Sequence, residues 1–228
     1  MTINLNKRLT CSASLAAMAL LAGAAVAPAA KPPKPPANAI NLSAKPNPLS
    51  FGGYVTLSGR LTGGGNGGKT VTLQVDPYPF ADDGFLNKAT KTTASNGDYS
   101  FTQAPVRNNR YRVVGSTSPK VTSPSVTVSV AYRVGLTVSD STPRKGTRVR
   151  FSGSVGPTKE GATAFIQKRR GDGIFVTVAR ATLTAGTESR SLYSKRLLIN
   201  ASGTYRVRVS GDAERVAGTS RTRTLTVH

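Results

Sequence analysis

The sequence has little of the residue types from which catalytic and metal sites are usually built. Among its 228 residues are one cysteine, one histidine, no tryptophan and ten acidic residues. The single cysteine, Cys11, excludes an internal disulfide and a cysteine-rich metal site. The single histidine, His228, is the last residue, and a fraying chain end does not hold a proton shuttle or metal ligand in place. The absence of tryptophan argues against a stacking platform for neutral sugars.

The sequence also lacks the acid–base partners of an enzyme. A catalytic nucleophile needs a neighbouring base and a group that orients that base, and the only histidine is the terminal one. The acids are scattered along the chain, and the one adjacent pair, Asp82 and Asp83, precedes Gly84 in the manner of a solvated turn. We therefore expect no enzymatic activity, no cofactor and no metal site.

Calcium binding stays open as an alternative for the acids of the first half. Calcium prefers oxygen ligands from carboxylates and amides. Such side chains are present at Asp76, Asp82, Asp83, Asn96 and Asp98. Their spacing matches no calcium loop, so we expect them to be turn residues beside strands.

Positive charge is the most pronounced feature that is present. The chain has 31 Lys and Arg residues against 10 Asp and Glu, a formal net charge of +21. Residues 31–133 hold 12 basic and 4 acidic side chains, and residues 134–228 hold 17 and 6, so the second half is the more basic. This balance favours partners of negative charge at low salt.

Residues 1–30 have the three parts of a secretory signal peptide. They begin with Lys7 and Arg8, continue with an apolar run over residues 15–26, and end with small residues before a cleavage site. We expect cleavage near Ala29–Ala30 and a secreted, extracellular protein. The apolar run is too short to span a bilayer, so we expect no membrane span.

After the signal peptide, proline content and apolar periodicity divide the chain. Residues 31–38 contain KPPKPP, which is expected to be an extended spacer because proline lacks the backbone N–H group and fixes φ. Farther on, apolar residues recur at every second position, as at Val55 and Leu57 and again at Val149 and Phe151. This period of two predicts half-buried strands. No helical periodicity of useful length follows the spacer, so the sequence predicts an all-β fold.

The strand pattern occurs twice along the chain. NRYRVV at 109–114 returns as GTYRVRV at 203–209, and LSGRL at 57–61 returns as FSGSV at 151–155. About seven strands in roughly 95 residues is the expectation for an immunoglobulin-like sandwich. We therefore expect two tandem immunoglobulin-like β-sandwich domains after a cleaved signal peptide, with the first domain at residues 39–133 and the second at residues 134–228.

Four short motifs of the first half have a pattern found in known modules. They are GRL at 59–61, VTL at 71–73, ASNGDYSF at 94–101 and NRYRV at 109–113. With them the first half resembles the immunoglobulin-like or carboxypeptidase-regulatory-like β-sandwich modules of secreted bacterial proteins, and the whole chain is similar to tandem immunoglobulin-like proteins of actinobacteria. The resemblance implies a fold and a turn chemistry rather than an activity. Regulatory-like modules usually have Asp where this chain has Ser95, which argues against a bound ion there.

Two tyrosines, Tyr111 and Tyr205, stand near the start of the repeated strand. They resemble the tyrosine corner of Greek-key sandwiches, in which the hydroxyl bonds to nearby backbone. We expect a structural role for both, because a buried tyrosine needs a partner for its hydroxyl.

Arginines alternate with apolar residues in three predicted strands of the second half. They are Arg148, Arg150, Arg206, Arg208, Arg221 and Arg223. Because side chains alternate across a strand, each pair is expected on the solvent side of a sheet, and neighbouring strands would combine the pairs into one cationic face. The guanidinium group matches phosphate and carboxylate in geometry. The expected partners are therefore anionic surface polymers, such as teichoic-type phosphates or acidic polysaccharide.

Other interpretations of this charge stay open. Nucleic acid is the weaker alternative, because the solvent-side neighbours of the arginines are mainly Ser and Thr without aromatic residues for base stacking. The basic residues also suit solubility and the protection of edge strands, in which case the chain is a passive spacer without a ligand. The sequence as a whole favours a non-enzymatic, structural or adhesive protein of the cell surface.

Overall fold

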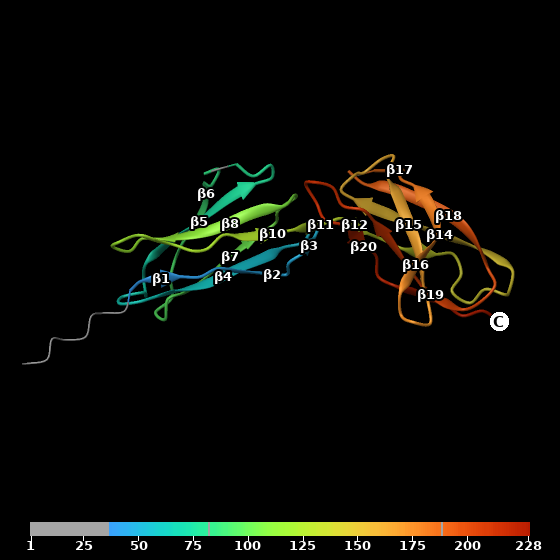
Figure 1. Cartoon of the computed structure of the whole chain (residues 1–228), viewed down its shortest axis with the longest axis horizontal. Helices are drawn as coiled ribbons and strands as arrows, with labels where there is room; N and C mark the ends of the chain where they lie inside the picture. Colours follow the sequence, from blue (N-terminus) through green and yellow to red (C-terminus); the bar gives the residue numbers. More distant parts are fainter. Residues whose placement is uncertain (1–36, 82, 188) are drawn as a thin grey trace, which may run out of the picture. The chain divides into compact units, whose positions relative to one another are not determined.

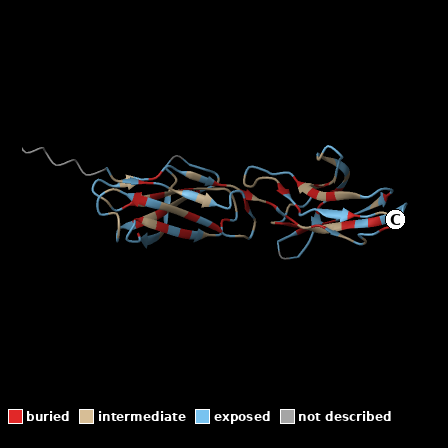
Figure 2. Ribbon diagram, turned by 90° about the horizontal axis from the view of Figure 1, so that it is seen from below, coloured by how far each residue is buried: buried red, intermediate tan, exposed pale blue. Residues whose placement is uncertain are grey.

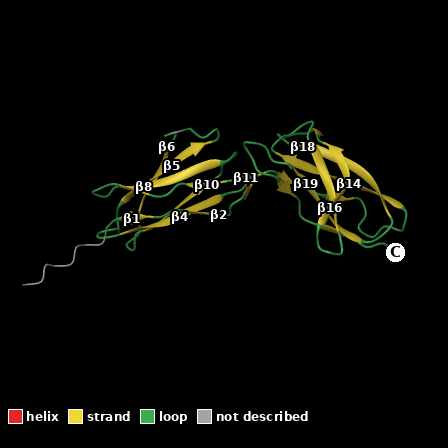
Figure 3. Cartoon of the chain, in the orientation of Figure 1, coloured by secondary structure: helices red, strands yellow, loops and turns green. Residues whose placement is uncertain are grey.

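The computed structural model describes residues 37–81, 83–187 and 189–228. Every regular element within these ranges is a β-strand, as Figure 3 shows, so the all-β prediction is confirmed. The part of the chain that the structure describes holds no helix able to cross a membrane. The expected signal peptide and most of the expected spacer lie outside the described residues.

The strands of the first half form the body that we call the first sandwich (Figure 1). They are β1 (Ala39–Ile40), β2 (Ser43–Lys45), β3 (Leu49–Ser50), β4 (Val55–Thr62), β5 (Thr70–Pro77), β6 (Leu86–Thr92), β7 (Asp98–Gln103), β8 (Asn109–Gly115), β9 (Val121–Thr122), β10 (Val126–Val128) and β11 (Val130–Ala131). In one sheet the order is β1-β4-β2, and β7 also pairs with β4. In a second sheet the order is β10-β8-β5-β6, and β9 also pairs with β8. A small parallel pair joins β11 to β3.

The strands of the second half form the second sandwich. They are β12 (Arg133–Val134), β13 (Thr137–Val138), β14 (Thr147–Gly156), β15 (Thr163–Arg169), β16 (Phe175–Thr182), β17 (Thr184–Ala185), β18 (Ser191–Ile199), β19 (Gly203–Val209), β20 (Gly218–Thr219) and β21 (Arg223–Leu225). One sheet has the order β12-β14-β18-β17 with β13 also on β14, and the other has the order β16-β15-β19-β20 with β21 also on β19. The strands of both sheets pair antiparallel.

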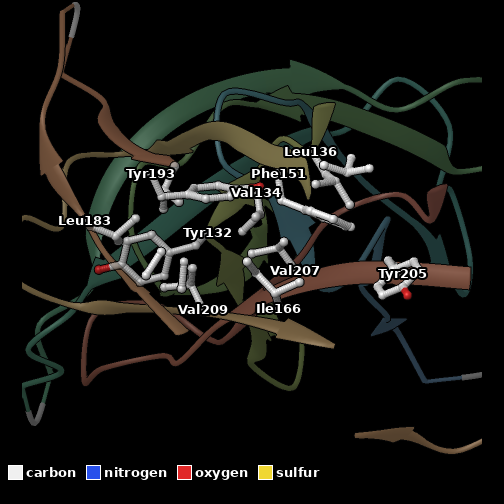
Figure 4. Close-up of a cluster of buried hydrophobic side chains, with 14 of the residues drawn as sticks. Tyr132, Val134, Leu136, Phe151, Ile166, Leu183, Tyr193, Tyr205, Val207 and Val209 are labelled. Atoms are coloured by element: carbon white, nitrogen blue, oxygen red, sulfur yellow. The ribbon is translucent and has the colours of Figure 1, made fainter. Parts of the chain in front are cut away.

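Each sandwich encloses its own cluster of buried side chains, and the two clusters share no residue. Buried bands alternate with exposed and intermediate ones along the long strands (Figure 2), as the period of two predicts. The second cluster brings Phe151 from one sheet against Ile166, Tyr205 and Val207 from the other (Figure 4). Burying side chains of this size contributes about 1.5–3 kcal/mol each to folding. The domain boundaries themselves stay a prediction, and Tyr132 packs in the second cluster.

The strand registers of the two sandwiches correspond residue by residue. Gly59 of β4 lies opposite Tyr99 of β7, and Gly153 of β14 lies opposite Tyr193 of β18. The strands β5 and β15 also correspond, because each pairs with its neighbour through a register shift at the same point, just before a glutamine. A position in one sandwich therefore has a defined counterpart in the other, which supplies an internal comparison for every proposed site.

Candidate functional site

The tyrosine contacts with the backbone are made by tyrosines other than the predicted ones. The hydroxyl of Tyr99 donates to the carbonyl of Asn41, and that of Tyr193 donates to the carbonyl of Gly135 at 2.5 Å. Burial raises the pKa of both hydroxyls. Each ring lies opposite a glycine, and the missing side chain there leaves room for the hydroxyl to reach the backbone.

Tyr111 and Tyr205 are buried, but they serve as core residues. The hydroxyl of Tyr111 accepts a hydrogen bond from the side-chain amide of Asn109 at 3.0 Å rather than bonding to backbone. The ring of Tyr205 packs on Phe151 with 5.1 Å between centroids. The bonds of Tyr99 and Tyr193 run to carbonyls 58 residues away in the sequence, so they tie distant segments together and differ from the expected corner contact with nearby backbone.

Two of the acids that were candidates for calcium, Asp76 and Asp98, are held by arginines, whereas Asp83 is exposed in a turn. Asp76 is only 2% exposed and forms an ion pair with Arg110 at 2.5 Å. Asp98 forms a two-pronged ion pair with Arg60, with distances of 2.5 and 3.1 Å. Since each carboxylate is already neutralised by a different arginine, the two do not combine into a cation site. Asp82 lies outside the described residues.

The structure divides the predicted arginines between two sheets. Arg148 and Arg150 extend from β14, whereas Arg206 and Arg208 extend from β19, which belongs to the other sheet of the second sandwich. The buried residues of both strands face the same core, so these two arginine pairs point away from each other on opposite sides of the sandwich. The single cationic face that neighbouring strands would have formed is absent from the described residues.

Arg223 is exposed, but contrary to the prediction it does not join the outward row of its sheet. It lies opposite the buried Tyr205, and its Nε donates to the carbonyl of Leu136 at 3.3 Å. The reason is Leu225, which is fully buried and two residues away, so that both side chains leave the strand on the same side. Arg221 precedes β21 and is exposed.

The outward side of β14 and β18 holds three exposed arginines, and we call it the β14–β18 face. Arg150 lies directly opposite Arg196, and Arg148 lies opposite Leu198. No carboxylate of the described residues is within ion-pair distance of the three guanidinium groups. Like charges directly opposite each other destabilise an antiparallel pair, so this arrangement is unfavourable in the absence of an anion.

The first sandwich shows that the fold itself does not require these arginines. The counterpart of the pair Arg150 and Arg196 is the neutral pair Thr56 and Thr102. Sequence reasoning missed Arg196 because it stands in SLYSKRLLI, where apolar residues occur at both odd and even positions and conceal which side of the strand is buried. The repeated register identifies it.

Arg206 differs from the arginines of the β14–β18 face because it already has partners. Its Nε donates to Gln167 at 2.8 Å, and its guanidinium lies 3.9 Å from the centroid of Phe175. The first sandwich repeats this arrangement, since Arg112 donates to Gln74 at 2.7 Å and lies 4.1 Å from the ring of Phe85. The repetition indicates a stabilising role for the cluster.

Asp212 anchors a small polar network in the second sandwich. Its carboxylate accepts hydrogen bonds from the ammonium group of Lys159 at 2.7 Å and from the hydroxyl of Tyr132. The same ammonium group lies 4.2 Å from the centroid of the Tyr132 ring. Partial burial opposes ionisation, but the bonds from Lys159 and Tyr132 outweigh it and lower the pKa of Asp212 to about 2.

We expect Asp212→Asn to destabilise the protein at neutral pH and to have little effect at pH 2. A carboxylate whose folded pKa lies below its ordinary value stabilises the fold above that ordinary value, and loses this contribution as the pH falls through the folded pKa. The side chain is 40% exposed, so solvent screening limits the loss to about 1 kcal/mol. Urea unfolding of both proteins at pH 7, 4 and 2 measures it.

Asp140→Asn is the matched control for this experiment. Asp140 has no described cation within ion-pair distance, so its replacement is expected to leave the pH dependence unchanged. An equal loss of stability at pH 7 and pH 2 for Asp212→Asn would show that the contribution does not depend on the charge.

Comparisons with known proteins add little to this picture. No protein-family model matches the sequence, and no match to it was found among curated proteins. One similar solved structure is a tetra-tandem repeat in the extending region of a large adhesion protein, with 16% identity and a TM-score of 0.34 over 83% of this chain. The chain spans about half, 49%, of the length of that structure. A similarity of this extent carries no argument about partners or activity.

Proposed function

We propose that the chain is an exported, non-enzymatic protein of immunoglobulin-like modules with a structural or adhesive task, and that its second sandwich binds anionic polymers through the β14–β18 face. The observation that carries the proposal is the pair Arg150 and Arg196, which lie opposite each other. No carboxylate of the described residues is within ion-pair distance of either, and the corresponding residues of the first sandwich are two threonines. An anion that bridges the two guanidinium groups converts an unfavourable juxtaposition into two charge-assisted hydrogen-bonded pairs.

The chemistry of the face favours a polymer over a small anion. Neighbouring strands are about 4.8 Å apart, so three guanidinium groups spread over β14 and β18 contact several charges of one chain at once. Ser152 and Ser194, opposite each other in the next outward row, add hydroxyl groups for hydrogen bonds. Teichoic-type phosphates and acidic polysaccharide both offer this combination of repeated anions and hydroxyls.

This proposal keeps two of the six arginines predicted from the sequence, Arg148 and Arg150, and adds Arg196. Arg206 and Arg208 belong to the opposite side of the second sandwich, and Arg223 is bonded to a backbone carbonyl. The proposed lack of enzymatic activity rests on the sequence, which offers no positioned base.

The test replaces the arginine pair with its counterpart from the first sandwich. Arg150→Thr combined with Arg196→Thr is expected to weaken binding to immobilised dextran sulfate or polyphosphate by about tenfold at low salt, since two of three guanidinium groups are lost. Binding of the unmodified protein is expected to fall steeply with salt, because the interaction is between exposed charges. Elution from the two resins along a salt gradient measures both effects.

The matched control removes the same charge elsewhere in the second sandwich. Arg144→Thr combined with Lys145→Thr lowers the net charge by the same amount at two exposed positions outside the strands. It is expected to bind nearly as well as the unmodified protein. An equal loss in both double variants would show that overall charge, and not this face, is responsible, and no binding by the unmodified protein would favour a passive spacer.

A further inference from the structure

The outward side of the sheet formed by β16, β15 and β19 contains a row of cation, aromatic ring and cation. Phe165 on β15 lies opposite Arg180 on β16 and also opposite Arg208 on β19. The guanidinium of Arg180 lies 5.8 Å from the centroid of the Phe165 ring. We call this side the β16–β15–β19 face (Figure 1).

The first sandwich again provides the comparison. The counterpart of the row is Thr90, Thr72 and Val114, which has no charge and no aromatic ring. The neighbouring cluster of Arg206, Gln167 and Phe175 is by contrast repeated in the first sandwich, so the fold uses that cluster in both copies. The row through Phe165 is therefore an addition that the sandwich does not need for folding.

This row corrects the expectation that the outward neighbours of the arginines are mainly serine and threonine. Phe165 and Phe175 both occupy the outward side, beside Arg208 and Arg206. Phe165 was overlooked because it stands between Ala164 and Ile166 in an uninterrupted apolar run, and both of these neighbours are fully buried. The alternation along β15 turns the ring to the opposite side.

We propose that the β16–β15–β19 face binds single-stranded nucleic acid, with a base stacked on Phe165 and the flanking phosphates bound by Arg180 and Arg208. A single strand offers unpaired base faces for stacking together with regularly spaced phosphates. The two arginines are separated by two strand spacings, about 10 Å, and lie on either side of the ring. Neither has a described carboxylate within ion-pair distance.

The aromatic ring distinguishes this ligand from an acidic polysaccharide. Charge alone would account for the arginines, but a phenyl ring placed between two guanidinium groups adds a surface on which a planar base stacks. The face lies on the other side of the core from the β14–β18 face, so the two proposals concern different residues and each can fail without the other.

The test measures binding of the purified chain to a labelled thymidine oligonucleotide of about 12 nucleotides by fluorescence anisotropy. The unmodified protein is expected to bind it about tenfold more tightly than an abasic strand of the same length, because the abasic strand keeps the phosphates and lacks the bases. Equal affinity for the two strands would overturn the proposal, since binding would then depend on charge alone.

Two variants separate this face from the other one. Phe165→Thr, which installs the first-sandwich residue, is expected to weaken oligonucleotide binding about tenfold and to leave dextran sulfate binding unchanged, whereas Phe165→Tyr keeps a ring and retains binding. The double variant Arg150→Thr and Arg196→Thr is expected to show the opposite pattern. If Phe165→Thr does not fold, the exposed Arg180→Thr replaces it with the same expectation. Oligonucleotide binding unchanged in Phe165→Thr, or in Arg180→Thr where that variant replaces it, contradicts the proposal.

Discussion

Replacing Gly153 with alanine is expected to destabilise the second sandwich by about 3 kcal/mol or more. A Cβ atom at this position of β14 would overlap the carbonyl oxygen of Gly135 and lie 2.7 Å from the hydroxyl oxygen of Tyr193. That carbonyl accepts the buried hydroxyl, and the N–H of Gly135 donates to Ser154 at 2.8 Å, so the segment cannot retreat without losing hydrogen bonds. Forced overpacking of this kind costs about 1–3 kcal/mol, and each lost buried hydrogen bond adds about 1 kcal/mol.

The first sandwich predicts the same result at Gly59. A Cβ there would overlap the carbonyl oxygen of Asn41 and lie 2.6 Å from the Tyr99 hydroxyl oxygen, so Gly59→Ala is expected to destabilise the first sandwich to a similar extent. Gly171→Ala is the control, because nothing lies within 4 Å of its added Cβ. Its effect is expected to stay within about 0.5 kcal/mol.

Urea unfolding followed by far-ultraviolet circular dichroism measures the three glycine variants. The packing argument requires Gly153→Ala to unfold at a clearly lower urea concentration than Gly171→Ala, with an unchanged slope. If the two variants unfold together, the approach of the Gly135 backbone to β14 is not as close as described, and the tyrosine contact does not organise the sheet.

The sequence predicted the strands well because their physical signal is local. Alternation of Val149 and Phe151 with arginine defines which side of β14 is buried, and no tertiary information is needed to see it. The similarity of FSGSV to LSGRL predicted that β14 corresponds to β4. In the structure both strands place the glycine of this motif opposite a tyrosine. Repetition within one chain therefore revealed register as well as fold.

The candidate sites were harder to predict because they depend on which strands share a sheet. Nothing local separates the arginines of β14 from those of β19, yet the strand order places them on opposite sides of one core. Arg196 and Phe165 stand in segments with apolar residues on both sides, so their direction is decided by pairing and not by pattern. The partner of Asp76 was hidden for a related reason, since Arg110 is distant in sequence and adjacent only across β5 and β8.

Removing Arg110 is expected to have the second large effect, a loss of about 3 kcal/mol in the first sandwich. Asp76 is 2% exposed, and Arg110 holds it with its Nε at 2.9 Å and a second nitrogen at 2.5 Å. Arg110→Ala leaves a buried carboxylate without its counter-charge, which costs about 3–5 kcal/mol. Arg110 is 32% exposed, so water reaches the site after truncation and the lower end of this range applies.

Arg112→Ala is the matched control, because Arg112 is the next outward arginine of the same strand and has a neutral partner. It donates to Gln74 at 2.7 Å and stacks 4.1 Å from the centroid of Phe85, so its loss is expected to cost only about 1 kcal/mol. Equal losses in the two single variants would mean that lost packing of the arginine stem is what destabilises the sheet.

A double variant separates the charge from the packing. Asp76→Ala combined with Arg110→Ala removes the buried carboxylate together with its partner, and is expected to be more stable than Arg110→Ala alone, because no unpaired charge remains inside. Urea unfolding of the unmodified protein, Asp76→Ala, Arg110→Ala and the double variant completes the cycle. A double variant that is more stable than Arg110→Ala indicates a buried ion pair. Two independent packing defects would instead add their losses of stability, and the double variant would then be the least stable protein of the cycle.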